Sequence, residues 1–218
     1  MEYGPVNQMK TRIAVATVNG RAYYELVNEL QRKGLPFLSL KPWDPIPMNI
    51  KVVLTTEKES NQISHSNILL FEQGSKPKFV VDKANLIIQG KKSYERIVIG
   101  VDPGKTYGMA LLGDNKVLET LTASNIEEVT LLILDSLKRF PAEVRLVRVG
   151  DGPPEHTETL HIALDKTLPA DTFIEIVSEA KTSQLVNKSV NRRVLRDAVS
   201  AIKIAERNGR VFSRRDIS

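Results

Sequence analysis

The sequence contains no cysteine, which excludes disulfide bonds, thiolate zinc sites and cysteine nucleophiles. Carboxylates, histidines and backbone groups remain as possible metal ligands, so any metal bound by this chain should be a hard cation. The sequence also lacks an apolar run of about eighteen residues and a charged-then-apolar N-terminal leader. We therefore expect a cytoplasmic protein with no membrane span and no secretory signal.

Charge is distributed unevenly along a chain that is otherwise typical of a globular protein. The chain has 218 residues, 41% of them hydrophobic, which is enough for the core of one large domain or two small ones. The net charge is +3 over residues 1–90, −4 over residues 91–187 and +6 over residues 188–218. Carboxylates hold cations while Lys and Arg hold phosphates, so this pattern is typical of a metal-dependent nucleic-acid enzyme. A basic last helix that is merely solvated fits the same charges.

The first ninety residues predict a small α/β domain of the Rossmann or flavodoxin type. The expected order is a strand within 11–20, a helix over 21–34, strands at 35–40 and 50–56, short apolar runs at 66–71 and 77–82 that predict further strands, and a helix or linker over 83–96. The helix that follows "VNG" could cradle a phosphate at its N-terminus, but one glycine is far short of a dinucleotide fingerprint. We expect no nucleotide there.

The second domain is expected over residues 91–218, after the charge run "GKKSYER". Its pattern is three strands joined by tight turns, then helix, strand, helix, strand and a long last helix over about 187–208. This is the element order of the ribonuclease H fold, a mixed five-stranded sheet with flanking helices. The three histidines, His65, His156 and His161, are too scattered to form a metal site by spacing.

Two aspartates end predicted strands of this second domain. Asp102 closes "RIVIGVD" before Pro-Gly, and Asp151 closes "RLVRVGD" before Gly-Pro-Pro. A carboxylate embedded in a strand is costly unless it is paired or binds a cation. If the two strands are parallel neighbours, their carboxyl ends bring both aspartates to one edge of the sheet. A turn former or helix cap remains the alternative for each.

Asp197 lies at the centre of the apolar face of the predicted last helix. On a wheel of about 100° per residue it falls between Val190 and Ile204, with Ala201 and Val194 on the same face, although other faces of the helix were open to an acid. A carboxylate that points at the sheet needs a partner, either a metal or an arginine such as Arg148 or Arg193. The combination of Asp102, Asp151 and Asp197 suits a pair of divalent cations, with magnesium favoured because its ligands are oxygens.

These segments resemble a known family. "IVIGVDPGKTYGMALL" is similar to the first-strand motif of the RuvC-type Holliday junction resolvases and their YqgF-like relatives, and "IVSEAKTSQLVNKSVNRRVLRDAVSAIKIA" is similar to their closing strand, loop and helix. The likeness covers about residues 96–208. It implies a ribonuclease H-like fold, Mg²⁺ or Mn²⁺, and cleavage of branched DNA. Asp102 and Asp197 then match the first and last catalytic carboxylates, Asp151 stands where the family has a glutamate, and Lys181 matches a basic loop residue.

One position departs from the family pattern. The resolvases carry a fourth carboxylate one turn before the last one, where this chain has Val194, and Glu179 is the substitute ligand that we consider. The residues 1–90 have no counterpart in the bacterial resolvases. The cations expected to contact phosphates, without reading sequence, are Lys105, Lys181, Lys188, Arg192, Arg193 and Arg196.

The sequence therefore predicts a divalent-metal-dependent endonuclease that acts on structured nucleic acid. Branched DNA is the first expected partner and RNA the second, and a homodimer is expected because symmetric junction cutting needs two sites. Val194 motivates the alternative, a catalytically inactive nucleic-acid-binding or scaffold protein on the same fold. A third hypothesis is an ATPase of the sugar-kinase and actin type, because "GVDPGKTYG" resembles their phosphate turn. Those enzymes clasp ATP between two such domains, and this chain has length for only one.

Overall fold

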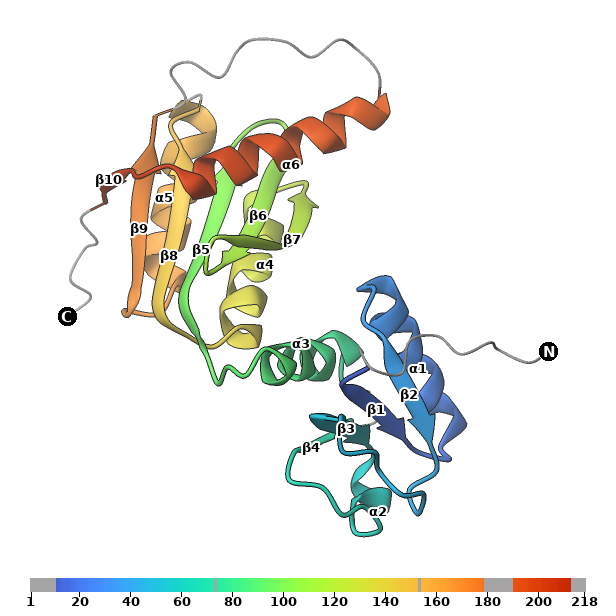
Figure 1. Ribbon diagram of the computed structural model, residues 1–218. Coiled ribbons are helices and arrows are strands. Elements are labelled where there is room, and N and C mark those ends of the chain that lie inside the picture. The colour runs from blue at the N-terminus through green and yellow to red at the C-terminus, as the bar shows by residue number, and fades with distance from the viewer. Residues whose placement is uncertain (1–10, 73, 153, 179–189, 213–218) are drawn as a thin grey trace. The chain divides into compact units, whose positions relative to one another are not determined.

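The computed structural model describes residues 11–72, 74–152, 154–178 and 190–212 (Figure 1). The chain forms two compact units, Met1–Lys92 and Ser93–Ser218, here called unit 1 and unit 2. Unit 1 contains a parallel sheet and unit 2 a mixed sheet, so the predicted α/β class is confirmed. No helix in the described ranges is long and apolar enough to cross a membrane.

Unit 1 is a four-stranded parallel sheet with the strand order β2-β1-β3-β4. Its elements in chain order are β1 (Ile13–Ala16), α1 (Gly20–Arg32), β2 (Phe37–Leu40), β3 (Val52–Thr55), α2 (Glu57–Ser60), β4 (Ile68–Leu70) and α3 (Pro77–Ile88). The chain passes from β1 outward to β2 and then crosses to β3 on the other side of β1. The strand order therefore reverses between β1 and β3.

Each face of this sheet buries its own apolar cluster. Helices α1 and α3 cover one face, where Leu26 and Leu30 of α1 meet Val81 of α3 over the alternate residues of β1 and β3. The other face is covered by the segments around Ile50 and Ile63. Strands buried on both faces read as continuous apolar runs, which is why "IAVA" and "VVLT" carry almost no polar residues.

The predicted strand at 77–82 is wrong, because these residues begin helix α3. Pro77 sits in the first turn of this helix, where its missing N–H costs nothing. The buried residues Val80, Val81 and Ala84 recur at helical spacing against the sheet. The β-branched pair suggested a strand, but packing on the sheet outweighs the small propensity difference.

Unit 2 is a mixed sheet with the strand order β10-β9-β8-β5-β6-β7. Its elements are β5 (Tyr94–Asp102), β6 (Tyr107–Gly113), β7 (Lys116–Ala123), α4 (Ile126–Arg139), β8 (Ala142–Gly150), α5 (Pro154–Thr167), β9 (Thr172–Val177), α6 (Val190–Glu206) and β10 (Arg210–Val211). Strands β5, β6 and β7 are antiparallel neighbours, whereas β5, β8 and β9 run parallel. The expectation of five strands missed β10, because two residues are too short to show a periodicity.

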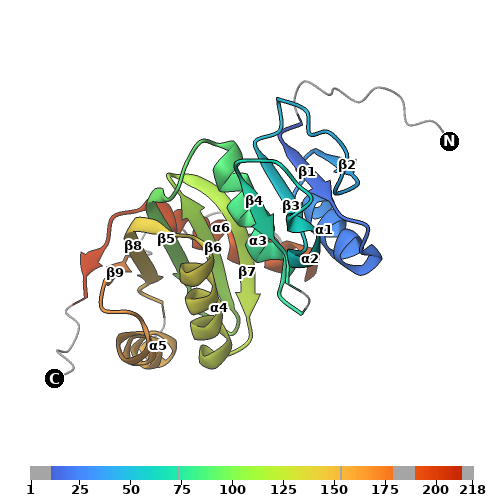
Figure 2. The same ribbon diagram turned by 90° about the horizontal axis from the view of Figure 1, so that it is seen from below.

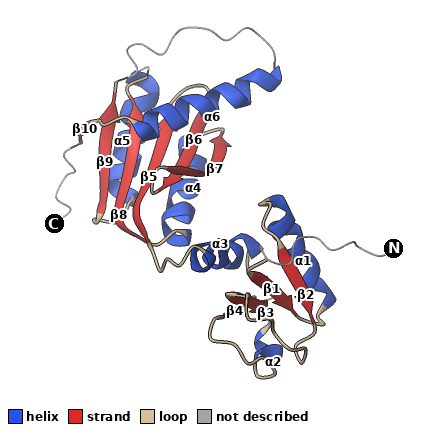
Figure 3. Ribbon diagram, in the orientation of Figure 1, coloured by secondary structure: helices blue, strands red, loops and turns tan. Residues whose placement is uncertain are grey.

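Helix α6 lies on one face of this sheet, and α4 and α5 lie on the other (Figures 2 and 3). The backbone of α6 comes very close to the strands beneath it. A Cβ at Gly100 of β5 would lie 2.2 Å from the carbonyl oxygen of Ala201, and a Cβ at Gly108 of β6 would lie 2.5 Å from that of Asp197. Only glycine permits this approach, which brings the middle and the second half of α6 close to the backbone of β5 and β6.

Candidate functional site

The carboxyl edge of the unit 1 sheet is the first place where polar side chains converge. Thr17 follows β1, Thr56 follows β3 and Phe71 follows β4, so all three lie where parallel strands end. Ligands of open α/β sheets bind outside this edge, at the point where the strand order reverses. In unit 1 that point is between β1 and β3.

A buried glutamate occupies this reversal point. Glu59 of α2 is only 8% exposed. Its Oε2 accepts hydrogen bonds from the hydroxyls of Thr17 and Thr56, each at 2.5 Å, and its Oε1 accepts from the backbone N–H of Val18 at 2.8 Å. Thr17 in turn accepts from the backbone N–H of Asn19 at 3.0 Å. One carboxylate therefore joins the ends of β1 and β3 to helix α2.

The hydrogen bonds decide the charge state of Glu59. Burial by itself acts to raise the pKa of Glu59, but the donors Thr17, Thr56 and the backbone amides of Val18 and Asn19 outweigh it and leave this pKa below its usual value. Glu59 is thus an ionised group whose oxygens are already occupied by protein donors.

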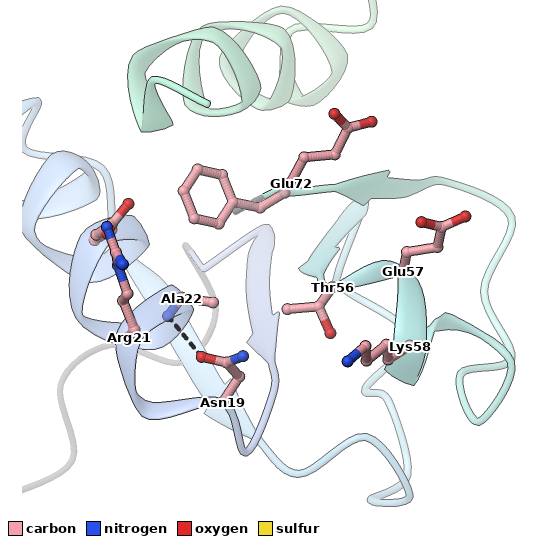
Figure 4. A pocket seen from close by; sticks show the side chains of 9 residues that line it. Asn19, Arg21, Ala22, Thr56, Glu57, Lys58 and Glu72 are labelled. Carbon is pink, nitrogen blue, oxygen red and sulfur yellow. Dashed lines mark hydrogen bonds and ion pairs between the residues drawn. The ribbon is translucent and has the colours of Figure 1, made fainter. Parts of the chain in front are cut away.

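A pocket of ≈ 200 Å³ opens beside this glutamate (Figure 4). Its wall combines the start of α1, the segment after β3 and the segment after β4. The lining residues are Asn19, Arg21, Ala22, Glu25, Thr56, Glu57, Lys58, Phe71 and Glu72. The side-chain oxygen of Asn19 accepts from the backbone N–H of Ala22 at 3.0 Å and so caps α1. The pocket is smaller than the roughly 300 to 1,000 Å³ of sites for drug-sized ligands.

Unit 2 brings two of the predicted site residues together. Asp102 ends β5. Asp197 lies on α6, at the point where the backbone of this helix comes close to Gly108 of β6. Asp197 accepts a hydrogen bond from the hydroxyl of Thr106 at 3.0 Å. The pKa of Asp102 is raised to about 6, mainly by burial and further by the negative charge of Asp197, while a hydrogen bond with Ser200 opposes the rise. Asp197 therefore has a second carboxylate, that of Asp102, as its neighbour.

Of the two arginines considered as partners for Asp197, the side chain of Arg193 lies outside the described residues and Arg148 is engaged elsewhere. Arg148 of β8 is buried, and its Nε donates to Glu175 at 2.8 Å. Its other nitrogens donate to the carbonyl of Ala205 and to the side chain of Asn208. This arginine therefore ties the C-terminal end of α6 to β8 and β9.

The remaining predicted site residues are placed only in part. Asp151 is exposed one residue beyond β8, at the same edge as Asp102 because β5 and β8 are parallel neighbours. Glu179 lies outside the described residues. Among the residues that are described, no group of three or more His, Cys, Asp or Glu side chains is placed to hold a metal ion. The catalytic and metal-binding roles of Asp102, Asp151 and Asp197 stay predictions.

The cations expected at phosphates are likewise scattered or undescribed. Lys105 is exposed and Arg196 is half-buried. Lys181 and Lys188 fall outside the described residues, as do the side chains of Arg192 and Arg193. The nucleic-acid and homodimer partners stay predictions.

Comparison with known families shows a likeness within unit 1. Residues 12–86 match the model of a response regulator receiver-like domain. The match begins at β1 and ends within α3, so it spans the whole parallel sheet and the pocket at its carboxyl edge. No curated protein matches the chain.

This finding corrects the functional prediction. The family match is to a receiver-like domain at residues 12–86 and not to a RuvC or YqgF nuclease domain, so the resemblance to junction resolvases is wrong as an assignment. The endonuclease prediction and its alternative of an inactive nucleic-acid-binding or scaffold protein fall with it. In unit 2 the described residues bring Asp102 and Asp197 together, and this pair of acids by itself does not specify a nuclease.

Sequence reasoning missed the residues that organise the unit 1 site. Glu59 lies on a helix of only four residues, too short to show a periodicity. Thr17 and Thr56 are ordinary residues at the ends of strands. The sequence does show their position, because each threonine comes directly after the last residue of a buried parallel strand. Their convergence depends on β1 and β3 being neighbours, which the sequence does not state.

Proposed function

We propose that residues 12–86 form a receiver-like signalling domain whose state is set by non-covalent binding and not by phosphorylation of a carboxylate. The family match supports the signalling role. The strand order β2-β1-β3-β4 supports the flavodoxin-like class of sheet, which has the order 2-1-3-4-5 and binds ligands at the junction of strands 1 and 3. The pocket lies at that junction.

The observation that carries this proposal is the chemistry at the end of β3. A covalent acyl phosphate requires a carboxylate oxygen that is free to attack phosphorus. Strand β3 ends in Thr55, and Thr56 follows it, so no carboxylate stands at this position. The buried Glu59 holds three protein donors on its two oxygens. A group stabilised in this way is a poor nucleophile, and its attack would break the contacts that join β1, β3 and α2.

The test exposes the full chain to acetyl phosphate and Mg²⁺ and measures its intact mass. A receiver domain known to accept phosphate is treated in the same way as the positive control. We expect the control to gain a phosphoryl group and this chain to gain none. A phosphoryl adduct mapped by peptide analysis to Glu57, Glu59 or Glu72 would refute the proposal.

For unit 2 we propose a ribonuclease H-like fold without the nuclease assignment. Three antiparallel strands, β5 to β7, are followed by the parallel strands β8 and β9, and α6 returns to the face opposite α4 and α5. This topology supports the class that the element order predicts. An experimental structure of residues 93–218 with a different strand order would contradict it.

We also propose that Asp102 and Asp197 hold one Mg²⁺ or Mn²⁺ ion. Magnesium is commonly bound through one or two carboxylates with waters completing its shell, so the pair fits this cation. A bound cation would supply the positive charge that two neighbouring carboxylates lack. We expect millimolar Mg²⁺ or Mn²⁺ to raise the melting temperature of the wild type, but not that of Asp102→Asn or Asp197→Asn. Glu143→Gln, which removes an exposed acid of β8, should keep the full metal response.

A further inference from the structure

We infer that the pocket at the carboxyl edge of unit 1 binds a small organic anion of single negative charge with a flat apolar body, such as an aromatic carboxylate. The inference deepens the proposed signalling function and rests on it, because this ligand would be the non-covalent input of the domain. Three features of the pocket carry the inference: an apolar wall, two inward donors and acids that are neutralised or turned away.

The apolar wall lies between α1 and β4. Phe71 is 3% exposed and Ala22 is 6% exposed, and both line the pocket. The hydroxyl of Thr56 donates to Glu59, which leaves its methyl group on the pocket side (Figure 4). A flat apolar group placed between Phe71 and Thr56 would remove the apolar wall of the pocket from water. This burial stabilises an apolar ligand more than a polar one.

Two donors face this wall. The side-chain oxygen of Asn19 is held by the backbone N–H of Ala22, so the amide nitrogen of Asn19 turns away from α1 and into the pocket (Figure 4). Lys58 extends toward the same region from the start of α2 (Figure 4). Within the described part of the chain, neither the Asn19 amide nitrogen nor the Lys58 ammonium has a hydrogen-bond or ion-pair partner. A carboxylate between them would accept a hydrogen bond from the neutral Asn19 amide and another from the charged Lys58 ammonium, and both bonds are charge-assisted because the acceptor is ionised.

The three acids of the lining decide the charge of the ligand. Glu25 is paired with Arg21 at 2.8 Å, and the carboxylates of Glu57 and Glu72 point outward, away from the pocket (Figure 4). An amine placed at the donors would meet Lys58 and not these acids. A phosphate ester with two negative charges would be repelled by the acidic rim more than a carboxylate would. The arrangement therefore favours a monoanion.

The experiment compares three ligands that share one phenyl ring. Benzoate, phenyl phosphate and benzylamine are titrated into the full chain near neutral pH, with binding followed by calorimetry and by amide NMR shifts of α1, α2 and the residues after β4. We expect benzoate to bind most tightly, phenyl phosphate more weakly and benzylamine not at all. The NMR shifts should map to the pocket, because weak ligands also bind elsewhere on a surface.

Two variants test the donors without disturbing the fold. Asn19→Asp keeps the side-chain acceptor that caps α1 but replaces the inward amide by an anion. Lys58→Gln removes the ammonium. Each should weaken benzoate binding about tenfold or more, the loss expected for a hydrogen bond to a charged group. Lys51→Gln, an exposed lysine at the opposite end of β3, should leave the affinity unchanged. Melting curves of all variants confirm that they are folded.

The possible outcomes separate the two proposals. Tighter binding of benzylamine than of benzoate, no binding of any of the three, or full benzoate affinity in both Asn19→Asp and Lys58→Gln would overturn this inference. None of these results changes the acetyl phosphate experiment. A phosphoryl adduct there would overturn the proposed function even if benzoate binds.

Discussion

Glu59 is the residue on which the carboxyl edge of unit 1 depends. Its carboxylate holds the ends of β1 and β3 together through Thr17, Thr56 and the amide of Val18. We expect Glu59→Gln to lower the free energy of unfolding of unit 1 by about 1 to 3 kcal/mol, because a buried ionic acceptor with three donors is replaced by a group that cannot satisfy all of them. Chemical denaturation measures this loss. Glu57→Gln, an exposed neighbour on the same helix, should be nearly neutral.

The contribution of Glu59 to the stability of unit 1 depends on pH, and the direction of this dependence follows from its lowered pKa. The pKa of Glu59 in the folded state lies below its usual value. Its contribution is therefore fully present above the pKa of the unfolded chain, about 4.3, and is lost as the pH falls through the lower folded value. The wild type and Glu59→Gln should differ most near neutral pH and converge in acid. A difference in stability that grows toward low pH would contradict this assignment.

Asp102 should act in the opposite sense. Its folded pKa of about 6 lies above the value of about 3.9 for an unfolded chain. The folded state therefore binds more protons between these two values, and the free energy of unfolding of unit 2 falls as the pH rises through this window. Asp102→Asn cannot ionise, so without added metal it should melt higher than the wild type at pH 7, with the difference vanishing near pH 4. Equal melting temperatures at pH 7 would show that Asp102 carries no such penalty.

At the scale of elements, the contact of α6 with the sheet is set by backbone and not by side-chain size. Gly100 allows the carbonyl of Ala201 to approach, and a methyl group there would overlap it. We expect Gly100→Ala to destabilise unit 2 by about 1 to 3 kcal/mol or more, because α6 must move away from β5. The melting temperature measures the effect. Gly20→Ala, which meets no atom within 4 Å at the start of α1, is the matched control and should cause little change.

The capping of helices is also decided locally. Asn125 accepts from the backbone N–H of Glu128 at 2.8 Å, and the Glu128 side chain accepts from the backbone N–H of Ser124 at 2.7 Å. This reciprocal pair fixes the start of α4. Helix α3 shows the converse, since its β-branched residues suggested a strand and only burial against the sheet made them helical.

At the scale of the whole molecule, each unit has its own sheet and its own core. We therefore expect two separable unfolding transitions. Glu59→Gln should shift only the transition of unit 1 and Gly100→Ala only that of unit 2. The double variant should show both shifts unchanged, because substitutions in separate cores that share no partners are additive. Calorimetry with hydrogen exchange assigns each transition. A single transition that both substitutions shift together would mean that the units unfold as one.

Much of the fold was accessible from the sequence because its signals are local. Buried parallel strands appear as apolar runs, the antiparallel strands of unit 2 are linked by Asp114 and Asn115 with positive φ, and α1 and α4 begin at asparagine caps. Strands of two residues, helices of four residues and a helix rich in valine and isoleucine were not accessible, because none of them has a period of its own.

The candidate sites were also predictable from the sequence only in part. The inward position of Asp197 follows from helical periodicity alone, and so does the expectation that it needs a partner. The identity of that partner does not, because Asp102 is distant in sequence and Arg148 proved to hold Glu175. In unit 1 the polar contacts at the carboxyl edge of the sheet join two threonines and one glutamate that form no sequence motif.

The sequence by itself determined the two α/β units, the strands that end in polar residues, the absence of thiol chemistry and the buried face of the last helix. These properties follow from composition and from periods of two and 3.6 residues. The tertiary structure alone decided that β1 and β3 are neighbours, that Glu59 closes the edge between them, and that a pocket with Asn19, Lys58 and Phe71 opens beside it. Such contacts join residues about forty positions apart, and no local pattern specifies which distant side chain arrives.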